Sequence, residues 1–216
     1  EFGRNVYGEA KTGAAAKEAK LVLASGNAGK LRELGEVLAP LGVMLKPQAH
    51  FDVPDVEETG LSFVENAIIK ARHAAEITGL PAVADDSGIE VDALDGAPGV
   101  YSARFSAPDA TDAKNNALLV EKLRNVAESE RTARYRAVIV YMRHARDPSP
   151  IICEGSWEGR IVLQPRGEGG FGYDPYFYLD THHCTSAELT AEQKNAISHR
   201  GQALQQLVHR LKTEHV

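Results

Sequence analysis

One stretch organises this sequence: Val83-Ala-Asp-Asp-Ser-Gly-Ile-Glu-Val-Asp-Ala-Leu-Asp-Gly-Ala-Pro-Gly99. The apolar run 81–84 is typical of a buried strand, and it ends in two adjacent carboxylates, Asp85 and Asp86. We expect Ser87-Gly88 to turn the chain, because Asp-Ser-Gly is common turn chemistry. Two neighbouring acids repel each other, and burying either one unpaired would be costly. A divalent cation such as magnesium would remove both problems, so a metal site and a simple turn cap are both open at this point.

The composition limits the class of protein. The chain has 216 residues, enough for one large domain or for two small lobes with a substantial core. Its formal net charge of -6 excludes a general basic field for duplex nucleic acid, although a local basic pocket is compatible with it. Cys153 and Cys184 are too few for a disulfide framework and lack zinc-binding spacing, so we expect free thiols in a reducing compartment.

The sequence shows neither a membrane span nor a signal peptide. No apolar run reaches the length of a membrane span, and residues 1–20 lack the apolar core of a signal peptide. We therefore expect a cytoplasmic protein without a membrane partner. Residues 1–19 are interpreted as a mobile N-terminal extension or an expression remnant, and residues 20–216 as the folded domain.

Hydrophobic periodicity predicts an alternation of strands and helices in the first half of the chain and consecutive strands later. The predicted strands are 21–25, 43–47, 81–84, 134–144, 151–157 and 160–164, the last two meeting at Glu158-Gly159. The predicted helices are 31–41, 62–78, 111–124, 188–196 and a last one that carries His199 and Arg200 in its first turn. This pattern indicates an α/β fold with a mixed sheet. If there are two lobes, we place their boundary between residues 106 and 131.

The turn Ser25-Gly-Asn-Ala-Gly-Lys30 joins the first strand to the first helix. Backbone N–H groups and a lysine at a helix N-terminus form a plausible phosphate cradle, although a tight connection with a surface lysine is the alternative. The turn is not a P-loop, because only two residues separate Gly26 from Gly29 and Leu31 stands where a Ser or Thr would hold magnesium. A metal would therefore have to be held elsewhere, and Asp85 and Asp86 could supply that role.

Three further features are candidates for a site. The loop 52–58 is acidic, and Lys70 lies on or beside the apolar face of the helix 62–78, where it is either a surface lysine or a ligand. The loop 166–175 is rich in glycine and carries Phe171, so it is either a ligand loop with a stacking face or a flexible connection. The first turn of the last helix, with His199 and Arg200, is well placed to meet an anion.

Four stretches together carry a resemblance: Ser25-Gly-Asn-Ala-Gly-Lys30, Ala84-Asp-Asp-Ser-Gly88 with Pro98-Gly-Val-Tyr-Ser-Ala-Arg104, Gly170-Phe-Gly-Tyr-Asp-Pro175, and Ser198-His-Arg200. From about Lys20 to Leu211 the sequence resembles the inosine triphosphate pyrophosphatase family, and within it the bacterial enzymes that act on dITP, ITP and XTP. The resemblance implies an α/β fold with a long central mixed sheet, flanking helices and two lobes around a substrate cleft. It also implies a homodimer, and magnesium-dependent hydrolysis of purine nucleoside triphosphates to the monophosphate and pyrophosphate, which clears deaminated purines from the nucleotide pool.

The same resemblance implies roles for individual residues. Asp86 would be the catalytic proton acceptor and a magnesium ligand. Apart from the resemblance, we expect Asp85 to support Asp86 from outside the ligands of the metal. Either Glu57 or Glu58 would be the second metal ligand, and the alignment slightly prefers Glu57. The implied substrate-binding residues are Ser25, Gly26, Asn27, Ala28, Gly29, Lys30, Lys70, Ser87, Phe171, Gly172, Tyr173, Asp174, Lys194, His199 and Arg200. Among these, 25–30, Lys70 and Lys194 would meet the phosphates, and the others except Ser87 would form the base pocket.

Other functions compete with this interpretation. A related house-cleaning pyrophosphatase for pyrimidine or modified nucleotides is the nearest rival. An aspartyl-phosphate phosphatase is disfavoured because Asp85-Asp86-Ser87 lacks the Asp-x-Asp-x-Thr pattern expected of it. A nucleotide-binding module without catalysis is disfavoured by the intact acids at Glu57, Glu58 and Asp86.

Overall fold

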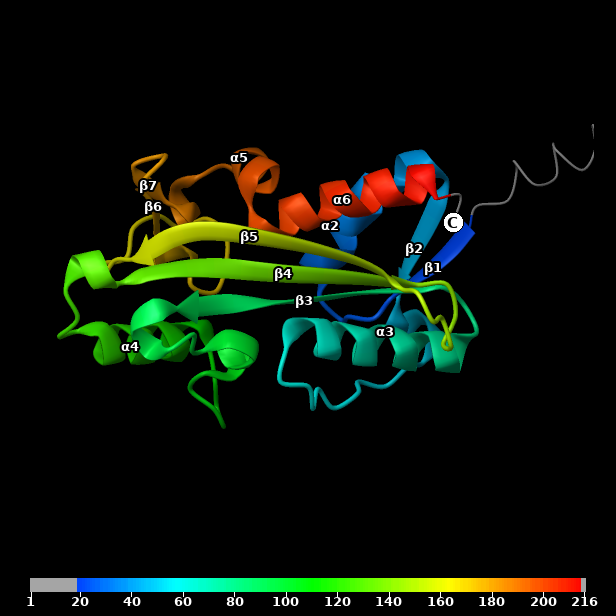
Figure 1. The fold of residues 1–216 in the computed structure, drawn as a ribbon, viewed down its shortest axis with the longest axis horizontal. Helices are drawn as coiled ribbons and strands as arrows, with labels where there is room; N and C mark the ends of the chain where they lie inside the picture. The colour runs from blue at the N-terminus through cyan, green and yellow to red at the C-terminus, as the bar shows by residue number, and fades with distance from the viewer. Residues whose placement is uncertain (1–18, 215–216) are drawn as a thin grey trace, which may run out of the picture.

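The computed structural model describes residues 19–214, so the predicted extension at residues 1–19 lies almost entirely outside the described residues. A seven-stranded sheet forms the framework, and helices cover both of its faces (Figure 1). The strands are β1 (Ala19–Leu23), β2 (Val43–Pro47), β3 (Ala82–Val91), β4 (Thr132–Met142), β5 (Ile151–Ile161), β6 (Phe177–Leu179) and β7 (Cys184–Thr185). The α-helices are α2 (Ala28–Leu38), α3 (Phe63–Thr78), α4 (Asp112–Leu123), α5 (Ala191–Ile197) and α6 (His199–Thr213). Short 3-10 helices occupy several connections, including η4 (Gly99–Arg104).

The sheet is mixed, as the sequence predicts. Its strand order is β2-β1-β3-β4-β5-β6-β7, with β1 parallel to β2 and β3 and every later neighbouring pair antiparallel. The strand β1 pairs with β3 only at Val22↔Ala82 and Leu23↔Val83, whereas β4 follows β3 along its whole length. One edge of β3 therefore has no neighbouring strand after Val83, and this open edge begins just before Asp85 and Asp86.

Each face of the sheet buries its own core because side chains alternate along the strands. Val83 and Ile139 pack with residues of α2 and α6, while Ala82, Ala84 and Val138 pack under α3. A third core gathers at the other end of the long strands and includes buried residues of α4. The strands β3, β4 and β5 run through both ends, so they join the two lobes that the sequence predicts (Figure 1).

Two predicted chain reversals are wrong. The strand β3 continues through Ser87-Gly88, and β5 continues through Glu158-Gly159 as a single strand. Both glycines serve close packing instead of a turn. A Cβ on Gly88 would collide with the carbonyl oxygen of Gly99, and a Cβ on Gly159 would lie 2.6 Å from Cζ of Phe177. Glycine inside a strand often marks such a close approach.

The helix α6 is fixed against the outer edge of β5 by two glutamine side chains. The Gln202 amide accepts from the Ser156 N–H at 3.3 Å and donates to its carbonyl oxygen at 2.8 Å. Gln206 makes the same pair of bonds to Glu154, at 3.1 and 2.7 Å. These bonds satisfy backbone groups that a free edge would expose, and they set the position of the N-terminus of α6.

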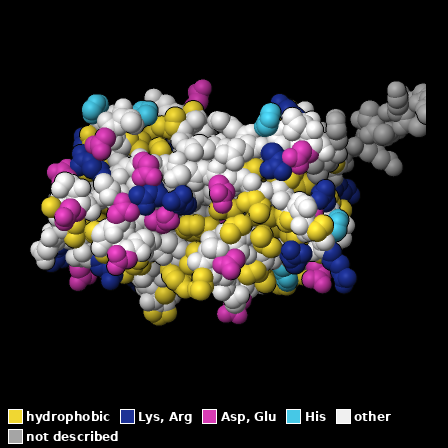
Figure 2. All heavy atoms as spheres, in the orientation of Figure 1, with side chains coloured by type: hydrophobic (Ala, Val, Ile, Leu, Met, Phe, Trp, Pro, Cys, Tyr) yellow, Lys and Arg dark blue, Asp and Glu magenta, His cyan; other side chains and the backbone are white. Residues whose placement is uncertain are grey.

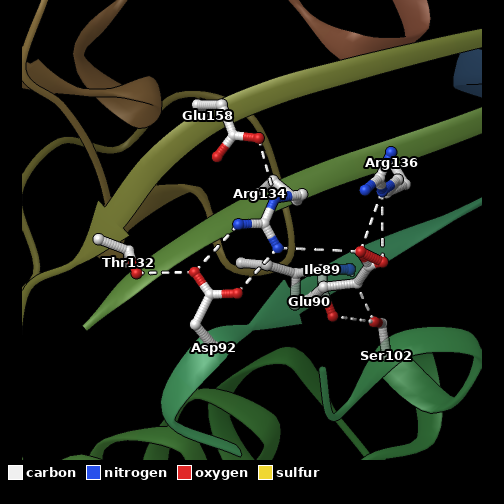
Figure 3. A network of polar contacts seen from close by, with 8 residues as sticks. All are labelled: Ile89, Glu90, Asp92, Ser102, Thr132, Arg134, Arg136 and Glu158. Atoms are coloured by element: carbon white, nitrogen blue, oxygen red, sulfur yellow. Dashed lines mark hydrogen bonds and ion pairs between the residues drawn. The ribbon is translucent and has the colours of Figure 1, made fainter. Parts of the chain in front are cut away.

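Cross-strand ion pairs favour one register where the C-terminal ends of β3 and β5 lie on either side of the N-terminal end of β4 (Figure 3). Arg134 lies opposite Glu90 on one side and Glu158 on the other, and its Nε donates to Glu158 at 2.9 Å. It also donates to both carboxylate oxygens of Asp92, at 2.9 and 3.0 Å. Opposite charges on facing strand positions favour one register. On the face drawn in Figure 2, acidic and basic side chains are intermixed.

Candidate active site

A cavity of about 370 Å³ lies beside the open edge of β3. Most of the residues predicted for the site line it. They are Asn27, Lys30, Glu58, Lys70, Asp86, Ser87, Phe171, Gly172, Tyr173, Asp174, Lys194, His199 and Arg200. The structure does not place Ser25, Gly26, Ala28, Gly29 or Glu57 on the cavity wall. Elements that are far apart in the sequence thus converge on one space.

Other lining residues were not predicted. They are Gly88, Ile89, Ser102, Ala103, Asp112, Asn115 and Tyr135. Ser102 and Ala103 belong to the motif 98–104, so the resemblance could have included them. Asp112 and Asn115 look in the sequence like ordinary residues of a helix N-terminus, and nothing in the sequence separates Tyr135 from its neighbours in a strand.

The two adjacent acids point to opposite faces of the sheet. Because side chains alternate along a strand, Asp85 shares the face of α2 and α6 and Asp86 shares the face of α3. The contacts agree, since Asp85 pairs with Lys30 and Arg200, whereas Asp86 lies near Lys70. The expectation that the two acids jointly hold one cation is therefore wrong.

Asp85 is an organising residue on the α2 and α6 side. It is 0 % exposed, with Oδ1 at 2.8 Å from Lys30 Nζ and Oδ2 at 3.0 Å from Arg200 Nε. Burial by itself would raise the pKa of this carboxyl, but the charges of Arg200 and Lys30 overcome that effect and hold the pKa well below its usual range. The ionised carboxylate thus ties the N-terminal turns of two helices to the strand.

Asp86 is the acid that faces the cavity on the α3 side. Its Oδ1 lies 3.6 Å from Lys70 Nζ, and Lys70 Nζ lies 3.2 Å from Oε1 of Glu58 and donates to the Asp85 carbonyl oxygen at 2.8 Å. The second oxygen, Oδ2, is buried without a hydrogen-bond partner among residues 19–214. Burial raises the pKa of Asp86 to about 6, with Lys70 opposing the shift and the nearby Glu58 and Asp85 charges adding to it.

The donor set on this side fits magnesium. Asp86 offers a buried oxygen that has no partner in the described structure, and Glu58 lines the same cavity. Magnesium is usually held by one or two carboxylates, together with water and substrate phosphates. Within residues 19–214 no cluster of three or more His, Cys, Asp or Glu residues has metal-binding geometry. Glu57 is exposed and does not line the cavity, so the geometry favours Glu58, against the slight preference of the alignment.

The predicted cradle forms the N-terminus of α2. Asn27 caps this helix, its Oδ1 accepting from the Lys30 N–H at 3.1 Å, and Ser25 Oγ accepts from the Asn27 N–H at 3.0 Å. The first amides of a helix have no partner within the helix, and Asn27 and Lys30 place this end of α2 at the cavity.

The glycine-rich loop forms the opposite wall. Phe171 is 57 % exposed, with Lys194 Nζ at 4.7 Å and Arg200 Cζ at 5.8 Å from the centre of its ring. Buried Asp174 holds this wall together, since its Oδ2 accepts from the Phe171 N–H at 3.0 Å and pairs with Lys194 Nζ at 2.6 Å. The exposed ring of Phe171 can stack on a flat ring, and the two cations that lie over it can donate hydrogen bonds to a ligand.

His199 lies at the base of this wall. Its ring stacks on Tyr135, with centroids 4.7 Å apart and an angle of 9° between the planes. Burial, helped by the charge of Arg200, lowers the pKa of His199 to about 3. The imidazole is therefore neutral in the folded protein at neutral pH, and its Nδ1 is buried without a partner in the described part of the chain.

A model of the Ham1 family matches residues 21–210. The chain belongs to the Ham1 family. A curated relative from Thioalkalivibrio sulfidiphilus (strain HL-EbGR7), named dITP/XTP pyrophosphatase, is 60% identical over 192 residues, which are 89% of this chain and 98% of the relative. A protein of the same name from Shigella flexneri is 58% identical over 193 residues, with the same shares covered. The solved structure of a HAM1 protein from Coxiella burnetii has a TM-score of 0.87 and 54% identity, covering 90% of this chain and 98% of that one.

Membership in the Ham1 family confirms the resemblance and the α/β fold that the sequence predicts. The matched residues, 21–210, include every residue predicted for the site. None of the helices between residues 19 and 214 is long and apolar enough to cross a membrane.

Proposed function

We propose that this Ham1-family chain hydrolyses the non-canonical purine nucleoside triphosphates ITP, dITP and XTP to monophosphate and pyrophosphate, and so clears deaminated purines from the nucleotide pool. Family membership and relatives named dITP/XTP pyrophosphatase, at 58% and 60% identity, confirm the prediction of a nucleoside-triphosphate pyrophosphatase. The observation that carries the proposal is that one cavity joins a cationic helix N-terminus, two acids and an aromatic wall.

The phosphates would lie between the N-terminus of α2, which carries Lys30, and Lys70 on the opposite side. Lys30 and the first amides of α2 supply positive charge and backbone donors on one side, and Lys70 supplies a second ammonium on the other. Asp85 keeps Lys30 and Arg200 in place through its two oxygens. Fixed cations of this kind stabilise the charge that spreads over phosphate oxygens during phosphoryl transfer.

Asp86 and Glu58 would hold magnesium, and Asp86 would act as the general base. When bound, the ion would offset phosphate charge and orient the attacking water. One carboxylate oxygen of Asp86 would hold the ion and the other would accept the proton of that water; Oδ2 has no hydrogen-bond partner among the described residues. Such general-base assistance is worth about 10²–10⁴-fold in rate.

Selection of the base would depend on donors beside Phe171. The resemblance assigns Lys194 to the phosphates, but its Nζ lies over the ring of Phe171, so we now place it with the base. Lys194 and the Arg200 guanidinium can only donate hydrogen bonds, which suits the keto oxygen at position six of hypoxanthine and xanthine. Adenine carries an amino donor there, and a buried donor left without an acceptor costs ~1–3 kcal/mol. Guanine also has a keto group at position six, so its exclusion must involve position two.

The proposal is tested by a substrate panel. Purified protein is incubated with magnesium and ITP, XTP, ATP, dTTP or UTP, and the products are separated. We expect IMP and pyrophosphate from ITP, slower turnover of ATP, and no turnover with a chelator until magnesium is restored. Preference for dTTP or UTP would favour the pyrimidine house-cleaning enzyme, and binding of ITP without any product would favour the non-catalytic module.

The assembly and location of the protein belong to the same proposal. We expect a homodimer, as the family resemblance implies, a purine nucleoside triphosphate as the small-molecule partner and no nucleic-acid partner. We expect it to act in the cytoplasm, where the nucleotide pool is kept. Sedimentation of the purified protein at several concentrations checks the dimer.

A further inference from the structure

We propose that Asp112 and Asn116 are positioning residues that clamp Gly172 and thereby hold Phe171 as a platform for the purine base. This inference rests on the proposed function, because it assigns a role to the loop that would receive the base. The two residues lie on α4, outside the motifs that carry the family resemblance.

The clamp consists of two hydrogen bonds, one to the backbone N–H of Gly172 and one to its carbonyl oxygen. Asp112 Oδ2 accepts from the Gly172 N–H at 3.0 Å, and Asn116 Nδ2 donates to the Gly172 carbonyl oxygen at 2.9 Å. Asp112 and Asn116 are four positions apart and so lie on the same face of the helix. Asn116 is buried, and its Oδ1 has no partner within residues 19–214, so its amide is committed to this one contact.

The helix that carries the clamp is itself firmly anchored. Asn115 accepts from the Ser106 N–H at 2.9 Å and donates to the Ala103 carbonyl oxygen at 3.1 Å. Ser102, which precedes Ala103 in η4, accepts from the Ile89 N–H of β3 at 2.9 Å. The helix cap is made by Thr111, whose hydroxyl accepts from the Lys114 N–H at 3.1 Å. The Asp112 carboxylate is therefore not needed for capping and is available to the loop.

The loop needs an external support. Gly167, Gly170 and Gly172 all have positive φ angles, and glycine-rich segments lose much conformational entropy when they are ordered. Phe171 is 57 % exposed, so burial contributes little to holding its ring in place. Asp174 fixes the Phe171 N–H from inside the loop, and α4 fixes the next residue from outside. The two supports together define the orientation of the platform before a base arrives.

The test compares Asp112→Ala, Asp112→Asn and Asn116→Ala in steady-state hydrolysis of ITP with magnesium. We expect Asp112→Ala and Asn116→Ala to raise KM roughly fivefold with kcat within about twofold, because one hydrogen bond corresponds to a two- to tenfold change in binding. Asp112→Asn keeps an oxygen that can accept from Gly172 and should restore KM. Glu121→Ala, an exposed change on the same helix, is the matched control and should leave both constants unchanged.

A double-mutant cycle with Phe171→Ala separates the clamp from direct contact with substrate, since Asp112 also lines the cavity. If Asp112 acts through Phe171, Asp112→Ala should add little to the effect of Phe171→Ala. Additive effects, an unchanged KM in Asp112→Ala, or equal losses in Asp112→Asn and Asp112→Ala would each overturn the clamp. If wild-type protein does not hydrolyse ITP, the proposed function fails and the clamp falls with it, whereas wild-type turnover with an unaffected Asp112→Ala variant contradicts the clamp alone.

Discussion

Asp85 and Asp86 show how much one strand position matters. The two acids are identical in type, yet one is buried against two cations and the other faces the cavity with an oxygen that has no partner among residues 19–214. The pKa of Asp85 lies well below its usual range, and that of Asp86 is raised to about 6. Environments that separate the pKa values of two carboxylates in this way are typical of sites in which one acid has a structural role and the other a chemical role.

Glu57 and Glu58 give a matched pair for testing the metal site. We expect Glu58→Gln to raise the magnesium concentration needed for half-maximal pyrophosphate release by tenfold or more, in line with the loss of one carboxylate ligand. Glu57→Gln, an exposed change one position away, should leave the magnesium dependence unchanged. A magnesium titration of both variants at saturating ITP is the measurement. A larger effect of Glu57→Gln would reverse the assignment.

The lowered pKa of His199 predicts that the free energy of unfolding depends on pH. Its pKa is about 3 in the folded protein and 6.5 in the unfolded chain, so between these values the unfolded state binds more protons. Stability should therefore fall as the pH drops below 6.5, by about 2 kcal/mol between pH 7 and pH 5 from this residue. Urea unfolding of wild type and His199→Phe at both pH values measures the effect. Equal pH dependence in the two proteins would show that His199 is not the cause.

At the scale of elements, the glycines inside β3 and β5 are packing residues. A Cβ on Gly159 would lie 2.6 Å from the ring of Phe177 and 2.7 Å from the Tyr178 carbonyl oxygen. We expect Gly159→Ala to lower the free energy of unfolding by ~1–3 kcal/mol, the usual range for overpacking. Gly35→Ala is the control, because a Cβ there meets nothing within 4 Å inside a helix and should stabilise the protein by up to ~1 kcal/mol. Denaturant unfolding of both variants checks the opposite signs.

The elements that the sequence predicts well are those with local signals. The helix α3 begins after its N-cap residue Ser62, whose side chain accepts from the Glu65 N–H, and β2 covers the predicted range 43–47. The errors occur where a long-range contact decides the local structure. Gly88 and Gly159 look like turn residues until the neighbours that exclude a side chain are known.

In the candidate site, too, the residues with a local sequence signal could be predicted, and those placed by long-range contacts could not. Residues in contiguous motifs, such as Lys30 and Phe171, could be named from the sequence, and they do line the cavity. Asp112 and Asn116 could not, because their contact with Gly172 joins positions 56 to 60 residues apart. The choice between Glu57 and Glu58 also needed the structure, since adjacent residues of one type differ only in the direction of their side chains.

At the scale of the whole molecule, the site exists because the sheet is incomplete. The strand β1 stops pairing with β3 at Leu23↔Val83, and the space beside the remaining edge receives the N-terminal ends of α2 and α6. The chain as a whole carries a formal charge of -6, yet Lys30, Lys70, Lys194 and Arg200 all line this one cavity. Four acids line the same cavity, Glu58, Asp86, Asp112 and Asp174, so the cations favour an anionic substrate through local contacts and not through a net positive field.

The most direct test of the account compares wild type with Asp86→Asn in hydrolysis of ITP with magnesium, following IMP, pyrophosphate and orthophosphate. Wild type should release IMP and pyrophosphate in equal amounts, and Asp86→Asn should release them about 10²–10⁴-fold more slowly. The variant should keep its thermal unfolding temperature within a few degrees, because Asn retains the size and shape of Asp. Orthophosphate as the product of wild type, or near-normal turnover in Asp86→Asn, would contradict the account.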